Sequence, residues 1–160
     1  MAFSAADVKN LREMTGVGMM DCKKALTEAD GNVDKAIEIL REKGLAKAAK
    51  KADRVAAEGV AYATVVNGVG VAIEVNSETD FAAKTDAFMD LVKNLAVVVA
   101  EQNPADVEAL KACTYPNSNL TVTEIMQEKV MSIGENMQIR RFARFPENTS
   151  VAYVHAGGTH

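Results

Sequence analysis

Few side chains in this sequence could carry out catalytic chemistry. A nucleophilic hydrolase combines a serine or cysteine with a histidine and an orienting acid. The sequence offers only His155 and His160, and both lie among its last six residues. It contains no Cys-x-x-Cys pair, no HExxH motif and no glycine-rich phosphate-binding loop. We therefore expect a protein that is not an enzyme and that holds no metal ion and no cofactor.

Three carboxylates, Glu78, Asp80 and Asp86, lie close together in the stretch EVNSETDFAAKTD (74–86). Strand-like residues give way to helix-like ones in this stretch, so the carboxylates fall near an expected helix start. Acidic residues at such a position are explained better by their attraction to the positive end of the helix dipole than by a role as a catalytic acid–base pair. Thr79 or Asp80 is suited to be the N-cap of this helix.

Phe81 follows directly after these capping candidates, and two interpretations remain open for it. It precedes Phe88 by seven positions, so in one continuous helix the two rings would share a face and Phe81 would belong to the core. Spacing alone favours this interpretation. The alternative is a contact residue, because an aromatic ring beside an acid at the tip of an element can enter a pocket of a partner protein.

The composition is that of an ordinary globular protein, with 48% hydrophobic and 25% charged residues among 160. A formal net charge of −4 argues against direct nucleic-acid binding. No apolar run approaches the ~18 residues of a membrane span, and the first ten residues, MAFSAADVKN, lack the features of a secretory signal or a transit peptide. We expect a cytoplasmic protein. Two cysteines do not make a disulfide framework.

Residues 1–44 are expected to form a small bundle of three short helices. Ser4 and Asp7 have the spacing of an N-terminal cap, and apolar residues then recur at helical spacing. The stretch TGVG (15–18) is expected to break the first helix, and Gly44 to end the third.

Met19 and Met20 begin the second helix of this expected bundle. Adjacent helical positions lie about 100° apart, so we expect one methionine in the core and the other facing solvent or a partner, where methionine makes adaptable contacts. Lys23 follows on the polar side. Residues 45–58, LAKAAKKADRVAAE, have strong helix propensity without a broad apolar face, which predicts a linker helix with a solvated charged surface.

Residues 59–145 are expected to form an α+β unit. Two β-branched runs flank Asn67-Gly68, the strongest short-range signal for an antiparallel hairpin. Helices are predicted after it, the longest ending near Asn103-Pro104. The stretch MQIRRFARF (137–145) then alternates as a strand, with Gln138, Arg140 and Arg144 on one face and Met137, Ile139 and Phe145 on the other. A further strand is expected at 150–156. Its unpaired edge could pair with a second copy of the chain, so a dimer is possible.

Several stretches resemble the bacterial translation elongation factor Ts family. They are LREMTGVGMMDCKKALTEADGNVDKAIEILREKG in the first helices, KAAKKADRVAAEG in the linker, EVNSETDF, and IGENMQIRR, in the family's order. The likeness covers essentially the whole chain. It implies a bundle at 1–44 similar to ubiquitin-associated domains, a linker helix at 45–58, a first core subdomain at 59–145, and at 146–160 the start of a second core subdomain that is cut short.

The resemblance also implies a function. Members of the family are guanine-nucleotide exchange factors: they bind the GDP form of elongation factor Tu, promote GDP release, and leave when GTP enters. Their Thr-Asp-Phe motif enters the GTPase near its Mg²⁺ site, and this implication reverses the preference for Phe81 as a core residue. The positions that match the family's contact residues are Met19, Met20, Lys23, Thr79, Asp80, Phe81, Ile133, Gly134 and His155, the last in a stretch that includes Tyr153.

Two departures from the family pattern bear on this function. Ala82 follows Phe81 where valine is common, so we expect less apolar volume beside the ring and a weaker contact. The second core subdomain is expected to be incomplete. The alternative function is therefore a docking module that binds the GTPase without efficient exchange.

Overall fold

The computed structural model describes residues 3–146, and within them the predicted α+β class is confirmed. The described chain divides into two compact units. The first comprises the residues up to Asp53 together with Met126–Gly134, and the second comprises Arg54–Ile125 and the residues from Glu135 onward. The helix α7 (Val122–Ile133) therefore contributes its first residues to the second unit and the remainder to the first.

The first unit contains the predicted three-helix bundle, formed by α1 (Ala5–Thr15), α2 (Met19–Glu28) and α3 (Val33–Lys51). The predicted cap of α1 is confirmed: the Asp7 carboxylate accepts a hydrogen bond from the Ser4 amide at 2.7 Å, and the Asp7 amide donates to Ser4 Oγ at 3.4 Å. The helix then ends at Gly16, whose positive φ of 69° favours glycine.

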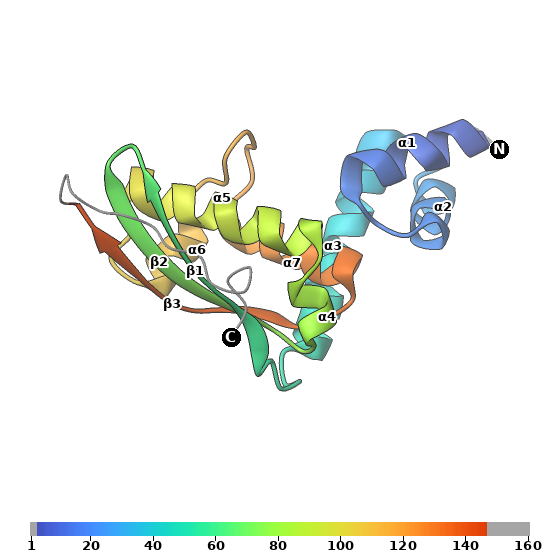
Figure 1. Ribbon diagram of the computed structural model, residues 1–160. Helices are drawn as coiled ribbons and strands as arrows, with labels where there is room; N and C mark the ends of the chain where they lie inside the picture. Colours follow the sequence, from blue (N-terminus) through green and yellow to red (C-terminus); the bar gives the residue numbers. More distant parts are fainter. Residues whose placement is uncertain (1–2, 147–160) are drawn as a thin grey trace. The chain divides into compact units, whose positions relative to one another are not determined.

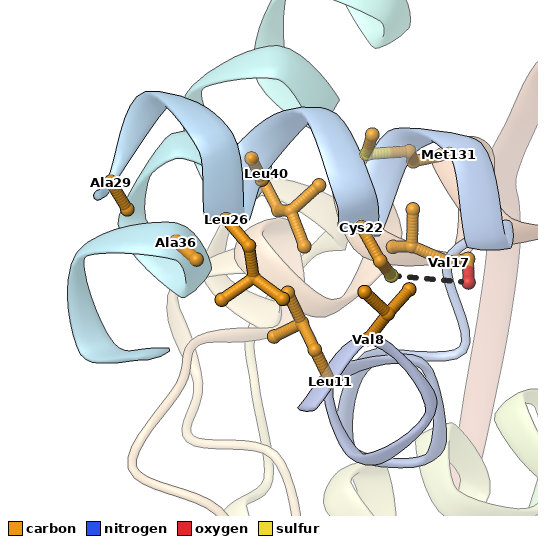
Figure 2. Packing of buried hydrophobic residues seen from close by; sticks show 10 residues of the cluster. Val8, Leu11, Val17, Cys22, Leu26, Ala29, Ala36, Leu40 and Met131 are labelled. Atoms are coloured by element: carbon orange, nitrogen blue, oxygen red, sulfur yellow. Dashed lines mark hydrogen bonds between the residues drawn. The ribbon is translucent and has the colours of Figure 1, made fainter. Parts of the chain in front are cut away.

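The core of this bundle is a cluster of buried aliphatic side chains (Figure 2). Leu11 and Leu26 are fully buried, and Met131 of α7 completes the cluster. Cys22 lies among them and donates its thiol hydrogen bond to the Val17 carbonyl at 3.5 Å. Burial raises the pKa of this thiol, so it remains protonated and behaves as a small apolar side chain. The likeness to ubiquitin-associated domains stays a prediction.

Gly44 does not end the third helix, and in this respect the prediction was wrong. The helix α3 continues through Gly44 to Lys51. The glycine is buried, and a Cβ placed there would lie 3.4 Å from the Gln127 carbonyl oxygen and 3.7 Å from Met131 Sδ. Close packing against α7 thus explains the glycine, and residues 45–51 extend α3 instead of starting a separate linker helix.

The second unit is built on an antiparallel sheet of order β1-β2-β3. Its strands are β1 (Glu58–Val66), β2 (Val69–Ser77) and β3 (Met137–Phe145). The predicted hairpin joins the first two, with φ of 50° at Asn67 and 81° at Gly68, as a tight turn of this kind requires. The predicted helix α5 (Asp86–Gln102) packs on β1 and β2 (Figure 1) and buries Phe88 completely.

Two short helices also belong to this unit: α4 (Asp80–Ala83) after β2, and α6 (Val107–Ala112), which packs near β3. A reciprocal capping pair starts α7 in a similar way. Thr121 donates from its amide and its hydroxyl to Glu124 Oε1, at 3.3 and 3.1 Å, and the Glu124 amide donates back to Thr121 Oγ1 at 3.2 Å.

The predicted alternation of β3 fails at a β-bulge. Glu74 pairs with Arg141 but Val75 pairs with Ile139, which leaves Arg140 as the extra residue. An extra residue moves every side chain that follows it in the strand to the opposite face of the sheet. Consequently Phe145 is 54% exposed and does not share the buried face of Ile139.

Arg144 lies beyond the bulge, as Phe145 does, and turns inward instead of sharing the exposed face of Gln138. Its Nε and Nη2 donate hydrogen bonds to the Ala100 carbonyl oxygen at 3.2 and 3.0 Å. The predicted strand at 150–156 lies outside the described residues, as does all but Pro146 of the range 146–160. The division of the chain into 1–44, 45–58, 59–145 and 146–160 stays a prediction.

Candidate functional site

The Thr-Asp-Phe stretch forms a single helical turn, α4, which is four residues long. Thr79 is its N-cap, and its hydroxyl accepts a hydrogen bond from the Ala82 amide at 3.3 Å. Ala82 and Ala83 are buried where α4 packs against β1 and β2. Asp80 and Phe81 point the other way: both are exposed, and the Phe81 ring is 80% accessible to solvent.

The exposure of Phe81 excludes the interpretation that it belongs to the core. Thr85 explains why the seven-residue spacing to Phe88 was misleading. It has extended backbone angles, φ −73° and ψ 148°, and its hydroxyl accepts a hydrogen bond from the Phe88 amide at 3.2 Å, so it starts a new helix. Because α4 and α5 are separate helices, residues seven apart across the break do not share a face.

A second segment of the chain supports the start of this turn. Glu135 accepts two hydrogen bonds from Thr79, one from the amide at 2.9 Å and one from the hydroxyl at 2.7 Å. The buried Ser77 donates its hydroxyl hydrogen bond to the Thr79 carbonyl at 2.8 Å. Sequence reasoning missed Glu135, because it follows Thr79 by 56 residues and no local spacing connects the two.

Asp80 is paired with a lysine of its own turn. Lys84 Nζ lies 3.0 Å from Asp80 Oδ2, and both side chains are more than half exposed. The hydrogen bond and the positive charge of Lys84 lower the pKa of the Asp80 carboxyl. Asp80 is therefore ionised across the neutral range and carries its negative charge next to the exposed ring.

Ala82 does not affect the exposed surface in the way expected from the sequence. Its side chain is only 6% exposed and is covered by the unit's own sheet. Because this side chain lies beneath α4, it forms no part of the exposed surface beside the Phe81 ring.

In the first unit, α2 presents three of the candidate residues to solvent. Met19 is 41% exposed, Met20 is 66% exposed, and Lys23 is exposed as well. The expectation that one methionine enters the core was wrong. Val17, in the loop before the helix, is buried instead and lies beside Cys22 in the core (Figure 2).

Ile133 and Gly134 lie at the end of α7, also in the first unit. Both are half-buried, and Gly134 stops the helix with a φ of 87°. Its carbonyl oxygen accepts a hydrogen bond from Lys51 Nζ. The candidate residues thus fall in both units. His155 and Tyr153 lie outside the described residues.

The part of the chain that the structure describes has no group of three or more His, Cys, Asp or Glu side chains arranged to hold a metal ion. Of the helices within residues 3–146, none combines the length and the apolar character that crossing a bilayer requires.

Comparison with known proteins identifies relatives of this chain. Residues 78–160 match the family model described as "Elongation factor TS". The chain is 48% identical over 160 residues to elongation factor Ts of Syntrophotalea carbinolica, covering 99% of this chain and 53% of that protein. It is 50% identical over 163 residues to elongation factor Ts of Trichlorobacter lovleyi, covering 99% of this chain and 52% of that protein.

The chain therefore spans about half the length of these curated relatives. The family model matches more than half of the chain and begins at Glu78, immediately before the capped turn that exposes Phe81. Because of this match, the chain belongs to the elongation factor Ts family.

Proposed function

We propose that this chain acts as a guanine-nucleotide exchange factor for elongation factor Tu, binding the GDP form of the GTPase and promoting GDP release during translation elongation. It acts by binding and makes or breaks no covalent bond. One observation carries the proposal: Phe81, a large apolar side chain, is 80% exposed on a turn whose backbone is fixed from two sides.

A ring held in this way suits a protein–protein contact. The turn is already ordered, so binding costs little further conformational entropy at this position. Covering the ring removes apolar surface from water, and buried aromatic anchors are among the residues that contribute most to interfaces. The neighbouring Asp80 adds a negative charge. Its ion pair with Lys84 can be replaced by a hydrogen bond to a group of the partner.

The proposed mechanism is displacement of the groups that hold the Mg²⁺ site of the GTPase. Asp80 and Phe81 enter between two helices of the partner near the bound nucleotide. The metal neutralises charge on the phosphates, so disturbing its surroundings weakens the binding of GDP. The coupling is reciprocal: if the factor weakens GDP binding by a given ratio, GDP weakens binding of the factor by the same ratio.

The remaining candidate residues form further contacts in this proposal. Met19 and Met20 offer exposed, flexible apolar side chains on α2, and Lys23 offers a positive charge on the same helix. Ile133, Gly134 and His155 are assigned to the contact surface on the family resemblance. The proposal includes a cytoplasmic location, where translation takes place, and no direct binding to nucleic acid.

A second candidate function is a docking module that binds the GTPase without efficient exchange. In that case Asp80 and Phe81 would contribute to affinity without accelerating GDP release. A dimer of this chain is compatible with either function.

The test is the rate at which a fluorescent GDP analogue leaves purified elongation factor Tu, with and without this chain. A second chain carries Asp80→Ala and Phe81→Ala, and a matched control carries Phe145→Ala. Phe145 is also exposed, at 54%, but lies on β3 away from the turn. The control therefore separates the loss of this particular ring from the loss of any exposed phenylalanine.

Acceleration that is retained by the Phe145→Ala chain and lost by the double variant is the expected result. Binding detected by co-elution without any acceleration would favour the docking module. A folded chain that neither binds elongation factor Tu nor accelerates release would refute both.

A further inference from the structure

Two segments of the second unit are joined by a reciprocal pair of carboxylate hydrogen bonds. Glu135 accepts from the Thr79 amide at 2.9 Å, while Glu78 accepts from the Asn136 amide at 2.7 Å. Each glutamate therefore binds the backbone of the residue that follows the other glutamate. We call this arrangement of Glu78, Thr79, Glu135 and Asn136 the glutamate clasp.

The clasp fixes the direction of the Thr79 hydroxyl. A hydroxyl group has one proton to donate and lone pairs with which to accept. At 2.7 Å from Glu135 Oε2, an acceptor-only carboxylate, the Thr79 proton must point toward the glutamate. The lone pairs then remain available for the Ala82 amide, 3.3 Å away, which is the bond that caps α4.

The turn has little intrinsic stability of its own. A helix of four residues is far shorter than the ~12–15 residues at which isolated helices become marginally stable. Its conformation must therefore be imposed by its neighbours. Ala82 and Ala83 attach one side to the sheet, and the bonds from Glu135 fix the end from which Asp80 and Phe81 project.

We propose that Glu135 is a positioning residue for Asp80 and Phe81. By holding both the amide and the hydroxyl of Thr79, it keeps the turn in the conformation that presents the ring to a partner. Glu135 acts through Thr79 and makes no contact with the partner in this proposal. The inference rests on the proposed function for its consequence in nucleotide exchange, but the conformational part concerns this chain alone.

The first test is amide hydrogen exchange followed by NMR on the 160-residue chain without a partner. Glu135→Gln keeps the size of the side chain but replaces the carboxylate by a neutral amide with one acceptor oxygen. We expect the Ala82 amide to exchange about tenfold faster in this variant, the size expected when a charge-assisted bond becomes a neutral one. The Thr79 amide resonance should also move.

Two comparisons separate a local effect from general destabilisation. The amide of the fully buried Leu91 in α5 should exchange at an unchanged rate in Glu135→Gln. Glu124→Gln is the matched control, because Glu124 binds the amide and hydroxyl of Thr121 in a similar way at the start of α7. It should leave the Ala82 amide unaffected.

The second test measures release of the fluorescent GDP analogue at increasing concentrations of each chain. If fewer molecules hold the presenting conformation, the apparent affinity falls by that fraction. We therefore expect Glu135→Gln to need more protein for half-maximal acceleration, by at most about tenfold if the loosened turn is mostly open, and to reach the parent rate at saturation. In a Thr79→Val background, where the hydroxyl is absent, the additional effect of Glu135→Gln should be smaller.

Unchanged exchange of the Ala82 amide in Glu135→Gln would overturn the inference. So would a loosened turn that leaves the concentration dependence of GDP release unaltered. A parent chain that does not accelerate release overturns the proposed function instead. The amide measurements then decide by themselves whether Glu135 fixes the turn.

Discussion

Replacing Phe81 by alanine should weaken binding to the partner strongly and leave the free energy of unfolding almost unchanged. The ring is 80% exposed, so its removal takes almost nothing from the core of the second unit. Phe88, seven residues later, is 0% exposed and provides the matched comparison. The two substitutions delete the same atoms from neighbouring helices, so any difference between them reflects where the ring lies.

The magnitude of the binding effect follows from the exposed area. A phenylalanine buries about 150–250 Å² when fully covered, and 80% of this, roughly 120–200 Å², is available to a partner. At about 25 cal/mol per Å² this area is worth about 3–5 kcal/mol. Association offsets part of it through ordering and desolvation. We expect Phe81→Ala to weaken binding by about 2–4 kcal/mol, roughly 30- to 900-fold in Kd.

The effect on stability should be close to zero. Surface substitutions change the free energy of unfolding by about 0.5 kcal/mol or less, whereas Phe88→Ala removes a buried ring and should cost about 3–5 kcal/mol. Urea denaturation followed by circular dichroism measures both values. Isothermal titration with the GDP form of elongation factor Tu measures the affinity of the parent and of Phe81→Ala.

Two results would refute this reasoning. If Phe81→Ala destabilised the chain as much as Phe88→Ala, the ring would be part of the core and its exposure would not describe the protein in solution. If Phe81→Ala bound the GTPase as tightly as the parent chain, the exposed ring would not be an anchor of the interface.

Two further predictions concern stability and charge. Gly59→Ala should lower the free energy of unfolding by at least about 2 kcal/mol in urea denaturation. The glycine has a φ of +144°, and a Cβ there would overlap the Val75 carbonyl oxygen. Unchanged stability would contradict this close approach. Lys84→Met should raise the pKa of Asp80 toward its ordinary value, since the lysine is the main cause of its lowering. Because the folded pKa is lowered, the contribution of this ion pair to stability is present above the unfolded pKa and is lost as the pH falls through the folded pKa. An NMR titration of the Asp80 carboxyl carbon measures the shift, and equal pKa values in both chains would show that Lys84 is not its cause.

Local sequence signals predicted much of the fold. The cap formed by Ser4 and Asp7, the Asn67-Gly68 turn and the end of the long helix α5 at Asn103 all appear in the structure. Each depends on interactions within a few residues, such as a capping hydrogen bond or a positive φ that asparagine and glycine tolerate. Such signals can be detected in a single sequence because the interacting groups are also close in the chain.

Signals that have two physical explanations could not be resolved by local spacing alone. Gly44 could end a helix or permit close packing, and only its contact with α7 shows that it does the second. Phe81 could have shared a face with Phe88 in one continuous helix, and only the break at Thr85 separates them. The alternation of β3 was correct as far as the bulge at Arg140, beyond which Phe145 faces solvent.

The sequence by itself determined the identity of the candidate site, because Thr79, Asp80 and Phe81 are adjacent and resemble a family motif. Only the tertiary structure decided that the ring is exposed and that its turn is held by Glu135, 56 residues after Thr79. The physical reason is that a turn of four residues cannot order itself. Its conformation depends on a carboxylate from a distant segment, and the folding of the chain brings the two together.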